Sequence, residues 1–335
     1  MFILDFVKLG SLLDAFLKQR SPLPLLSQAI QQSTQTNHWF TEHHILLSLR
    51  AITDHFLQQE KLHTWLAAYP NIAYTYQNEV TIVMAGNIPL VGYHDYLSIL
   101  ASGRKAAVKL SSKDPFLLPA LHNLLCSIAP EWQTRVRFVP EVPTETNSII
   151  ATGSDATAAW FATRYPHLPK IIRGHRVSIA VIPPHITKTQ ITALHRDMFL
   201  YFGLGCRSVV KLFLPDKFDI TRITDLDQMP EEASHLGFRN AYRRQKALLT
   251  LQQRPFTDGG FFILQEADTL SPPIATIYYT YYKAINEVVT YIQEHDSHIQ
   301  CVVGVDADIK KSVIFGCAQN PQLWDYADGI DTMRI

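Results

Sequence analysis

The feature that most constrains the fold is a regular alternation of short apolar runs and helical patterns between residues 80 and 165. The runs have the length and β-branched content of buried strands: VTIVMAG (80–86), KAAVKLS (105–111), RVRFVP (135–140) and NSIIATG (147–153). Helical patterns follow the first, second and fourth runs, at 90–103, 116–129 and 154–165. Strand–helix–strand units of this length predict a parallel sheet covered by helices, with ligands at the carboxyl ends of the strands.

A second set of strand and helix patterns begins after residue 175. Strands are expected at 176–182, 209–215, 261–265 and 299–305, and helices before Cys206, at 231–252 and in the tyrosine-rich run IYYTYYKAINEVVTYI (277–292). Residues 1–68 are expected to be helical. The whole pattern predicts an α/β protein with two lobes and a cleft between them.

Composition excludes several classes of protein. Hydrophobic residues make up 47% of the 335 residues and charged residues 18%, which is typical of a folded chain. Lys plus Arg and Asp plus Glu balance at 30 each, so no nucleic-acid partner is expected. Asp5, Lys8 and Asp14 interrupt the apolar N-terminus, which therefore predicts an amphipathic helix rather than a membrane span or signal peptide. We expect a cytoplasmic protein.

Polar side chains follow the strands of the first set. Asn87 comes directly after a strand, where its amide can donate a hydrogen bond into a cleft or cap a helix. A second group, which either holds phosphate and ribose or forms a solvated loop, consists of Lys109, Ser111, Ser112 and Lys113. Gly153 and Ser154 form a turn before a helix, which is a potential anion site. No GxGxxG motif occurs, so the ordinary dinucleotide fingerprint is absent.

Cys206 lies between a glycine pair and a strand, in YFGLGCRSVVKLFLP (201–215). Glycine allows close backbone approach there, so the thiol is either a nucleophile or a small buried side chain. The chain's four cysteines are far apart and form no CxxC pair: Cys126, Cys206, Cys301 and Cys317. Neither a metal site nor a disulfide framework is therefore expected, and this usage suits a reducing compartment.

Five segments in this order resemble the aldehyde dehydrogenase superfamily: GNIPL (86–90), VKLSS (108–112), ATGSDAT (151–157), GLGCR (203–207) and IFGCAQNPQLWDYADGIDTM (314–333). The chain is more similar still to the LuxC-type acyl-CoA reductases, from about residue 75 to the C-terminus. The resemblance implies a two-lobed fold with a Rossmann-like cofactor domain. Its implied domains are an NADP-binding domain with a helical N-terminal region (1–174), a catalytic domain (175–317) and a C-terminal helix or tail (318–335).

The resemblance also implies roles for individual residues. Cys206 matches the family nucleophile, and Asn87 matches the amide of the oxyanion hole. Lys109 matches the lysine that binds the cofactor ribose. The remaining cofactor positions are Ser111, Ser112, Lys113, Gly153 and Ser154, with Glu266 as a further ribose ligand.

Two departures from the superfamily favour reduction. The glutamate that activates hydrolytic water is replaced by Ile172 or Arg173, and His175, in the same segment, is a candidate proton donor. The glutamate after the cofactor lysine is replaced by Ser112 beside Lys113, which predicts NADPH as the cofactor. We therefore expect NADPH-dependent reduction of long-chain acyl-CoA to fatty aldehyde through a thioester on Cys206.

Two alternatives stay open, a non-acylating aldehyde dehydrogenase and a non-reducing subunit that carries an acyl group. The implied partners are an acyl-CoA or acyl-carrier substrate, an acyl-protein synthetase and further copies of the same chain. No metal is expected.

Overall fold

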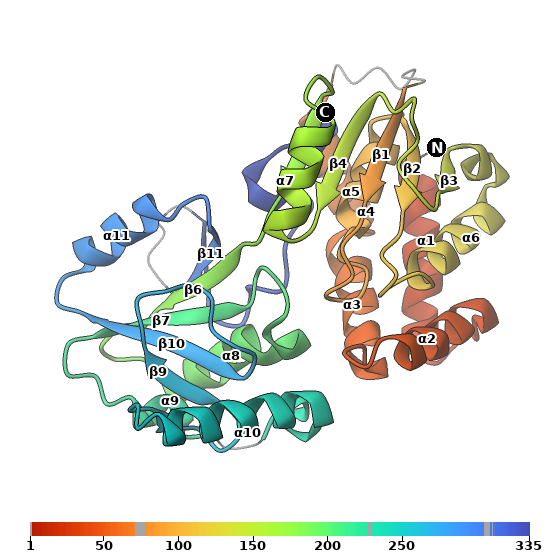
Figure 1. Ribbon diagram of the computed structural model, residues 1–335. Helices are drawn as coiled ribbons and strands as arrows, with labels where there is room; N and C mark the ends of the chain where they lie inside the picture. Colours follow the sequence, from red (N-terminus) through yellow and green to blue (C-terminus); the bar gives the residue numbers. More distant parts are fainter. Residues whose placement is uncertain (1, 71–77, 227–228, 305–308, 310) are drawn as a thin grey trace. The chain divides into compact units, whose positions relative to one another are not determined.

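The computed structural model describes residues 2–70, 78–226, 229–304, 309 and 311–335 (Figure 1). The chain divides into two compact units. The first comprises Met1–His175 with Pro321–Ile335, and the second comprises Arg176–Asn320. The chain thus leaves the first unit after His175 and returns to it at Pro321.

The first unit is built on a parallel sheet of five strands in the order β3-β2-β1-β4-β5. The strands are β1 (Glu79–Val83), β2 (Lys105–Lys109), β3 (Val136–Phe138), β4 (Ser148–Thr152) and β5 (Lys170–Arg173). The chain proceeds from β1 outward to β3 and then continues on the other side of β1 with β4. This order matches that of a dinucleotide-binding half and places a topological switch point between β1 and β4.

Helices form most of the rest of the first unit. They are α1 (Phe2–Leu17), α2 (Pro24–Thr36), α3 (Glu42–His55), α4 (Gln59–Ala67), α5 (Tyr93–Ala101), α6 (Leu117–Ile128) and α7 (Asp155–Arg164), with a 3-10 turn η1 (Pro130–Thr134). The helical N-terminal region expected at 1–68 is confirmed as α1 to α4. The strands expected in this unit are confirmed as β1 to β4, and β5 is an addition.

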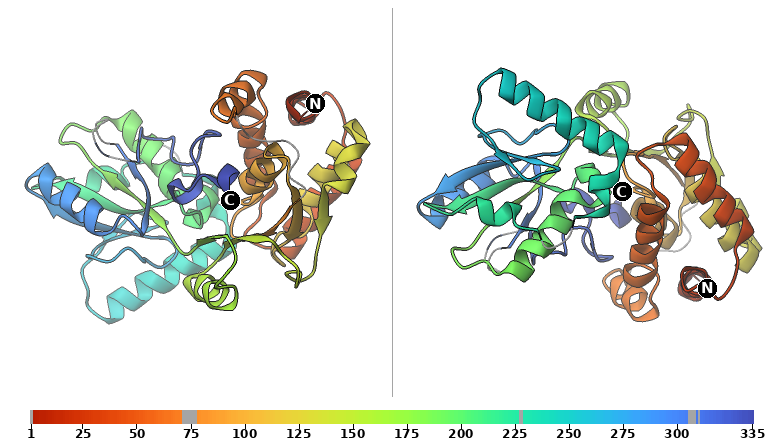
Figure 2. Two further views of the ribbon diagram at one scale, coloured as in Figure 1. Left: turned by 90° about the horizontal axis from the view of Figure 1, so that it is seen from above. Right: turned by 90° about the horizontal axis from the view of Figure 1, so that it is seen from below.

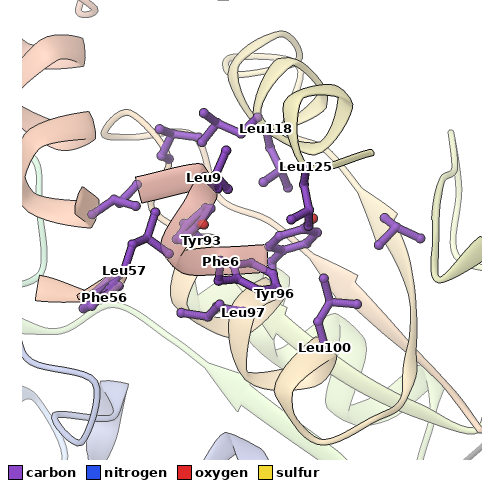
Figure 3. Close-up of a cluster of buried hydrophobic side chains, with 14 of the residues drawn as sticks. Phe6, Leu9, Phe56, Leu57, Tyr93, Tyr96, Leu97, Leu100, Leu118 and Leu125 are labelled. Carbon is purple, nitrogen blue, oxygen red and sulfur yellow. The ribbon is translucent and has the colours of Figure 1, made fainter. Parts of the chain in front are cut away.

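Strand side chains alternate between two cores. Val80 and Ile82 of β1 and Ile150 of β4 face a large cluster shared with α1 to α6, part of which Figure 3 shows. Val83 of β1 contributes instead to a smaller cluster under α7. Because successive strand residues point to opposite faces, both faces of the sheet need apolar side chains. This requirement explains the unbroken apolar runs in the sequence.

The second unit contains a seven-stranded sheet in the order β12-β11-β6-β7-β10-β9-β8, in which only β8 is antiparallel among the described strands. The strands are β6 (Val177–Val181), β7 (Val209–Pro215), β8 (Thr257–Asp258), β9 (Ile263–Glu266), β10 (Thr276–Tyr282), β11 (Ile299–Val303) and β12 (Ser312–Val313). The helices are α8 (Lys188–Phe199), α9 (Thr221–Thr224), α10 (Leu236–Leu251) and α11 (Ile285–Glu294), with 3-10 turns η2 (Leu200–Gly203) and η3 (Glu231–Ser234).

One expectation about secondary structure was wrong. The tyrosine-rich run is not one helix, because Thr276–Tyr282 forms β10 between β7 and β9, and the helix starts only at Ile285. Aromatic and β-branched residues favour a strand with neighbours on both sides. For the C-terminal helix or tail expected at 318–335, the structure has a tail with the 3-10 turns η4 (Ala327–Gly329) and η5 (Thr332–Arg334). Asp328 and Gly329 both have positive φ, which a helix does not accommodate.

The C-terminal segment, 321–335, is fixed to the first unit by several hydrogen bonds. Tyr326 Oη accepts from Trp65 Nε1 at 2.6 Å and lies 2.6 Å from Tyr69 Oη. His94 Nε2 lies 2.9 Å from the carbonyl oxygen of Leu323. Within the described part of the chain, none of the helices is long and apolar enough to cross a membrane.

Candidate active site

In the first unit, the polar loops predicted from the sequence lie at one edge of the sheet. Asn87 follows β1, Lys109 ends β2, and the Gly153–Ser154 turn follows β4. Because β2, β1 and β4 are adjacent and parallel, their carboxyl ends share this edge. Asn87 is exposed, and the N-cap of α5 is Gly92, so Asn87 does not cap that helix. Its amide therefore has no role as a helix cap.

The loops after β1 and β2 are in direct contact. A Cβ atom added to Gly86 would lie 2.5 Å from Ser111 Oγ and 3.0 Å from Lys113 Cβ. The Ser111 hydroxyl also accepts a hydrogen bond from the backbone N–H of Lys113 at 3.2 Å. Ser112 and Lys113 are exposed beside this contact. Glycine is therefore needed at position 86 to bring the Asn87 loop against the serine–lysine loop.

Asp114 is a positioning residue that the sequence did not reveal. It is buried, and its Oδ2 accepts a hydrogen bond from the backbone N–H of Leu90 at 2.9 Å. Burial raises the pKa of Asp114 from 3.8 to about 6. Leu90 has a positive φ of 58° and follows Asn87 by three residues. Asp114 thus fixes the backbone of the loop that presents Asn87.

The turn after β4 forms as predicted. Ser154 is the N-cap of α7, and its hydroxyl accepts a hydrogen bond from the backbone N–H of Thr157 at 3.3 Å. Asp155, the first residue of the helix, accepts from the backbone N–H of His175 at 2.7 Å. The exposed His175 is therefore beside the Gly153–Ser154 turn. The sequence placed both residues at the site but did not reveal Asp155 as the residue that joins them.

No carboxylate replaces the missing glutamate at Ile172 or Arg173. Ile172 packs against the small apolar cluster under α7. Arg173 is buried, and its Nη1 donates to Asp95 Oδ2 at 2.5 Å in an ion pair. Its Nη2 also donates to Thr332 Oγ1 at 3.1 Å. Arg173 thus joins β5, α5 and the C-terminal segment, which is a structural role.

In the second unit, Cys206 lies in a turn between η2 and β7. Tyr201 and Phe202 have φ values of 56° and 60°, which are rare for aromatic residues, and Gly203 has a φ of 71°. The backbone N–H of Ser208 donates to the carbonyl oxygen of Gly205 at 3.0 Å and closes the turn. Cys206 is half-buried. Backbone strain of this kind clusters at functional sites.

Ser178 on β6 contacts both Cys206 and Cys301. Its hydroxyl donates to the carbonyl oxygen of Cys206 at 3.1 Å and lies 3.0 Å from Cys301 Sγ. Cys301 is buried, and burial raises the pKa of its thiol. The positive charge of Arg207 is close enough to the Cys301 thiol to oppose this rise of its pKa, so a cation lies near the two cysteines. Cys301 is thus a core thiol, whereas Cys206 is the accessible one.

The segment after Ile314 is fixed to the cysteine turn. Buried Asp197 on α8 accepts from the backbone N–H groups of Gly316 at 2.6 Å and Ala318 at 3.0 Å. Arg207 Nη1 donates to the carbonyl oxygen of Ala318 at 3.5 Å. Gln319 Nε2 donates to Ser208 Oγ at 3.1 Å. Burial raises the pKa of Asp197 to about 6.

Glu266 lies elsewhere in the second unit. It is exposed at the carboxyl end of β9, opposite Tyr279 of β10, which in turn pairs with Leu212 of β7. Leu212 is three residues into β7, or about 10 Å from its start. The structure therefore does not bring Glu266 next to Cys206.

Two further histidines, His94 and His195, have structural partners. His195 is buried, with Nε2 lying 2.7 Å from the carbonyl oxygen of Ile223, and burial lowers its pKa. His94 contacts the C-terminal segment. Among the described residues, no group of three or more His, Cys, Asp and Glu side chains is placed to hold a metal ion.

The first unit has groups suited to a nicotinamide dinucleotide. Its strand order places a topological switch point between β1 and β4, and the loops after β1 and β2 meet at Gly86 on the same edge of the sheet. Lys109 and Lys113 carry positive charge, and Ser111, Ser112 and Ser154 carry hydroxyl groups there. This donor set fits phosphates and ribose hydroxyls.

The fold is that of the aldehyde dehydrogenases. The NAD+ complex of an aldehyde dehydrogenase from Bacillus cereus superimposes with a TM-score of 0.66 at 12% identity, covering 92% of this chain and 72% of that chain. Aldehyde dehydrogenase 21 from Physcomitrella patens, in complex with the reaction product succinate, gives a TM-score of 0.65 at 12% identity, covering 96% and 78%.

Within this fold class, the chain belongs to the acyl-CoA reductase (LuxC) family, whose sequence model matches residues 24–314. A similar protein is the long-chain acyl-protein thioester reductase 2 of Photobacterium leiognathi, 23% identical over 241 residues, which are 67% of this chain and 46% of that protein. The long-chain acyl-protein thioester reductase of Photorhabdus laumondii is 24% identical over 183 residues, 50% of this chain and 36% of that protein. The chain thus matches less than half the length of each of these relatives.

Proposed function

We propose that this chain reduces a long-chain acyl thioester to a fatty aldehyde, with NADPH as the cofactor and Cys206 as the nucleophile. Family membership and the half-buried position of Cys206 support the proposal. The observation that carries it concerns Ile172 and Arg173, which occupy the place of the glutamate that activates water in the superfamily. Arg173 is paired with Asp95 and Ile172 is packed in a core, so neither supplies a base that activates water.

The Cys206 thiolate attacks the carbonyl carbon of the acyl thioester. The bond from that carbon to the donor sulfur then breaks, the donor leaves as a thiol after protonation, and the acyl group stays on Cys206 as a thioester. Asn87 donates its amide N–H to the carbonyl oxygen as negative charge develops there. His175 supplies a proton when the hemithioacetal collapses to aldehyde.

The cofactor position is assigned to the first unit. Lys109 and Ser111 would bind the adenosine ribose, Gly153 and Ser154 would hold the phosphates, and Lys113 beside Ser112 would neutralise a 2′-phosphate. When bound, the cofactor supplies the hydride for reduction. Glu266 is kept in this proposal as a further candidate ribose ligand, contributed by the second unit.

Intact mass spectrometry tests the proposal directly. Incubation with a long-chain acyl-CoA and no NADPH should add one acyl group, and NADPH should discharge it as aldehyde. Cys206→Ser should take up little or no acyl group, because a serine hydroxyl stays protonated without a base. The matched control is Cys126→Ala, which should be labelled like the wild type.

The products separate this function from its alternatives. Release of fatty acid instead of aldehyde would support a non-acylating aldehyde dehydrogenase. A stable acyl group that NADPH does not discharge would support an acyl-carrying subunit. Full acylation of the Cys206→Ser variant would contradict the role of Cys206.

A further inference from the structure

Helix α10 in the second unit is unusually exposed for its length. Only Phe238 and Leu249 of its sixteen residues are buried. Leu236, Leu248 and Leu251 are 66%, 40% and 82% exposed. Figure 2 shows this helix in teal, along one side of the second unit. A helix that exposes three leucines has a face that the described part of the chain leaves uncovered.

The same helix concentrates positive charge. The chain as a whole has 30 basic and 30 acidic residues, yet no Asp or Glu occurs from Ala233 to Thr257. The basic residues in this interval are Arg239, Arg243, Arg244, Lys246 and Arg254. Lys246 pairs with Asp258 at 2.5 Å. Among the residues that the structure describes, the four arginine side chains have no ion-pair partner.

Helix geometry places leucines and arginines on one face. At 100° per residue, Phe238 and Leu249 lie on one line of the helix, and this line is buried. The residues that we call the arginine face lie about 80° or more around the helix from this line. Leu236, Arg243, Arg244 and Leu251 are opposite it, and Arg239 and Leu248 lie on its two flanks. Arginine mixed with apolar residues is typical of protein interfaces, whereas lysine is depleted there.

The start of α10 packs against the turn that precedes Cys206. His235, the N-cap of α10, has its ring centroid 4.3 Å from that of Phe202, and Phe238 has its centroid 6.0 Å from the same ring. Phe202 belongs to the strained turn that precedes Cys206 by four residues. A molecule docked along α10 therefore has one end near the cysteine turn. All these contacts lie within the second unit.

We propose that the arginine face docks an acidic protein that carries the long-chain acyl group as a thioester and delivers it to Cys206. This inference rests on the proposed function. Guanidinium groups bind carboxylates through two parallel hydrogen bonds, so an Asp- and Glu-rich helix is the complementary surface. A membrane fits less well, because the exposed face has no aromatic residue and only one lysine lies near it. The printed names of the relatives, acyl-protein thioester reductases, agree with a protein donor.

Delivery is a thioester exchange and needs no redox step. The Cys206 thiolate attacks the carrier-bound acyl carbon, and the carbon–sulfur bond to the carrier breaks. The carrier sulfur leaves as a thiolate and takes a proton from solvent. The acyl group is then on Cys206, and the released carrier separates from α10.

The test compares a protein donor with a small donor. The variant Arg239→Glu/Arg243→Glu/Arg244→Glu is assayed with a long-chain acyl carrier protein and with the acyl-CoA of the same chain length. We expect kcat/KM to fall at least tenfold with the carrier protein and less than threefold with acyl-CoA. The binding of wild type to the carrier should also weaken steeply with added salt. The control reverses three exposed charges elsewhere, Lys8→Glu/Arg20→Glu/Lys217→Glu, and should keep carrier binding.

Each other outcome overturns the inference. Equal losses with both donors would assign the arginines to the phosphates of CoA, and no loss would exclude docking. Binding of wild type to anionic phospholipid vesicles but not to the carrier would assign the face to a membrane. A changed oligomeric state in the variant would assign it to a second copy. Carrier binding is measured by calorimetry without NADPH, so failure of the reductase function does not hide the result.

Discussion

Replacing Asp114 with asparagine should make the first unit respond differently to pH. The carboxyl is buried, and its pKa is raised from 3.8 to about 6 by burial. The folded state therefore binds more protons than the unfolded state between about pH 4 and pH 6, so this group makes the wild type less stable as the pH rises through that window. This rise of the Asp114 pKa from 3.8 to about 6 corresponds to about 3 kcal/mol of unfolding free energy above pH 6.

Asparagine resembles the neutral carboxyl, keeps one acceptor for the Leu90 N–H, and has no charge to desolvate. Loss of the second oxygen shifts stability by a constant of about 1 kcal/mol, independent of pH. The stability of Asp114→Asn relative to wild type should therefore rise by about 3 kcal/mol from pH 4 to pH 7.

Tryptophan fluorescence in urea is a suitable assay, because all five tryptophans belong to the first unit: Trp39, Trp65, Trp132, Trp160 and Trp324. The transition therefore reports the unit that contains Asp114. Asp216→Asn, at an exposed position in the second unit, is the matched control and should show no such trend. A difference between Asp114→Asn and wild type that stays constant with pH, or falls as the pH rises, would refute the reasoning.

Three further substitutions test the loops around the proposed cofactor. Asn87→Ala should lower turnover about 10²–10³-fold in steady-state kinetics and leave the urea midpoint unchanged, since α5 has its own N-cap; a lower midpoint with normal turnover would contradict the oxyanion role. Lys113→Glu should reduce or reverse the preference for NADPH over NADH, measured as a ratio of kcat/KM, and equal use of both cofactors by wild type would count against this. Gly86→Ala should cost about 1–3 kcal/mol and raise the KM for the cofactor, because its Cβ would lie 2.5 Å from Ser111 Oγ. Adding Ser111→Gly should recover part of both losses, and no recovery would mean that the contact is not the cause.

The sequence predicted the sheet of the first unit because its physical signal is local. Strands buried on both faces must be continuously apolar, and the polar loops at their carboxyl ends are then easily recognised. The tyrosine-rich run was misassigned because apolar spacing alone does not separate a helix from a central strand, and only its pairing with β7 and β9 decides.

The positioning residues could not be predicted in the same way. Asp114 acts on Leu90, which is 24 residues away, and Asp155 acts on His175, which is 20 residues away. Such pairs are defined by which loops meet in space, and a single sequence has no signal for that. The motif around Cys206 made it the candidate nucleophile, which stays a prediction, but the sequence did not predict the left-handed turn before it.

The return of residues 321–335 to the first unit sets the order in which the chain can assemble during synthesis. Residues 2–70 and 78–175 emerge from the ribosome first, but they lack the partner that Tyr326 provides for Trp65 and Thr332 for Arg173. The whole second unit, Arg176–Asn320, is made before that partner appears. The unit translated second is thus contiguous and can finish folding first. The first unit is completed only after residues 321–335 have been made and cover Arg173 and Asp95.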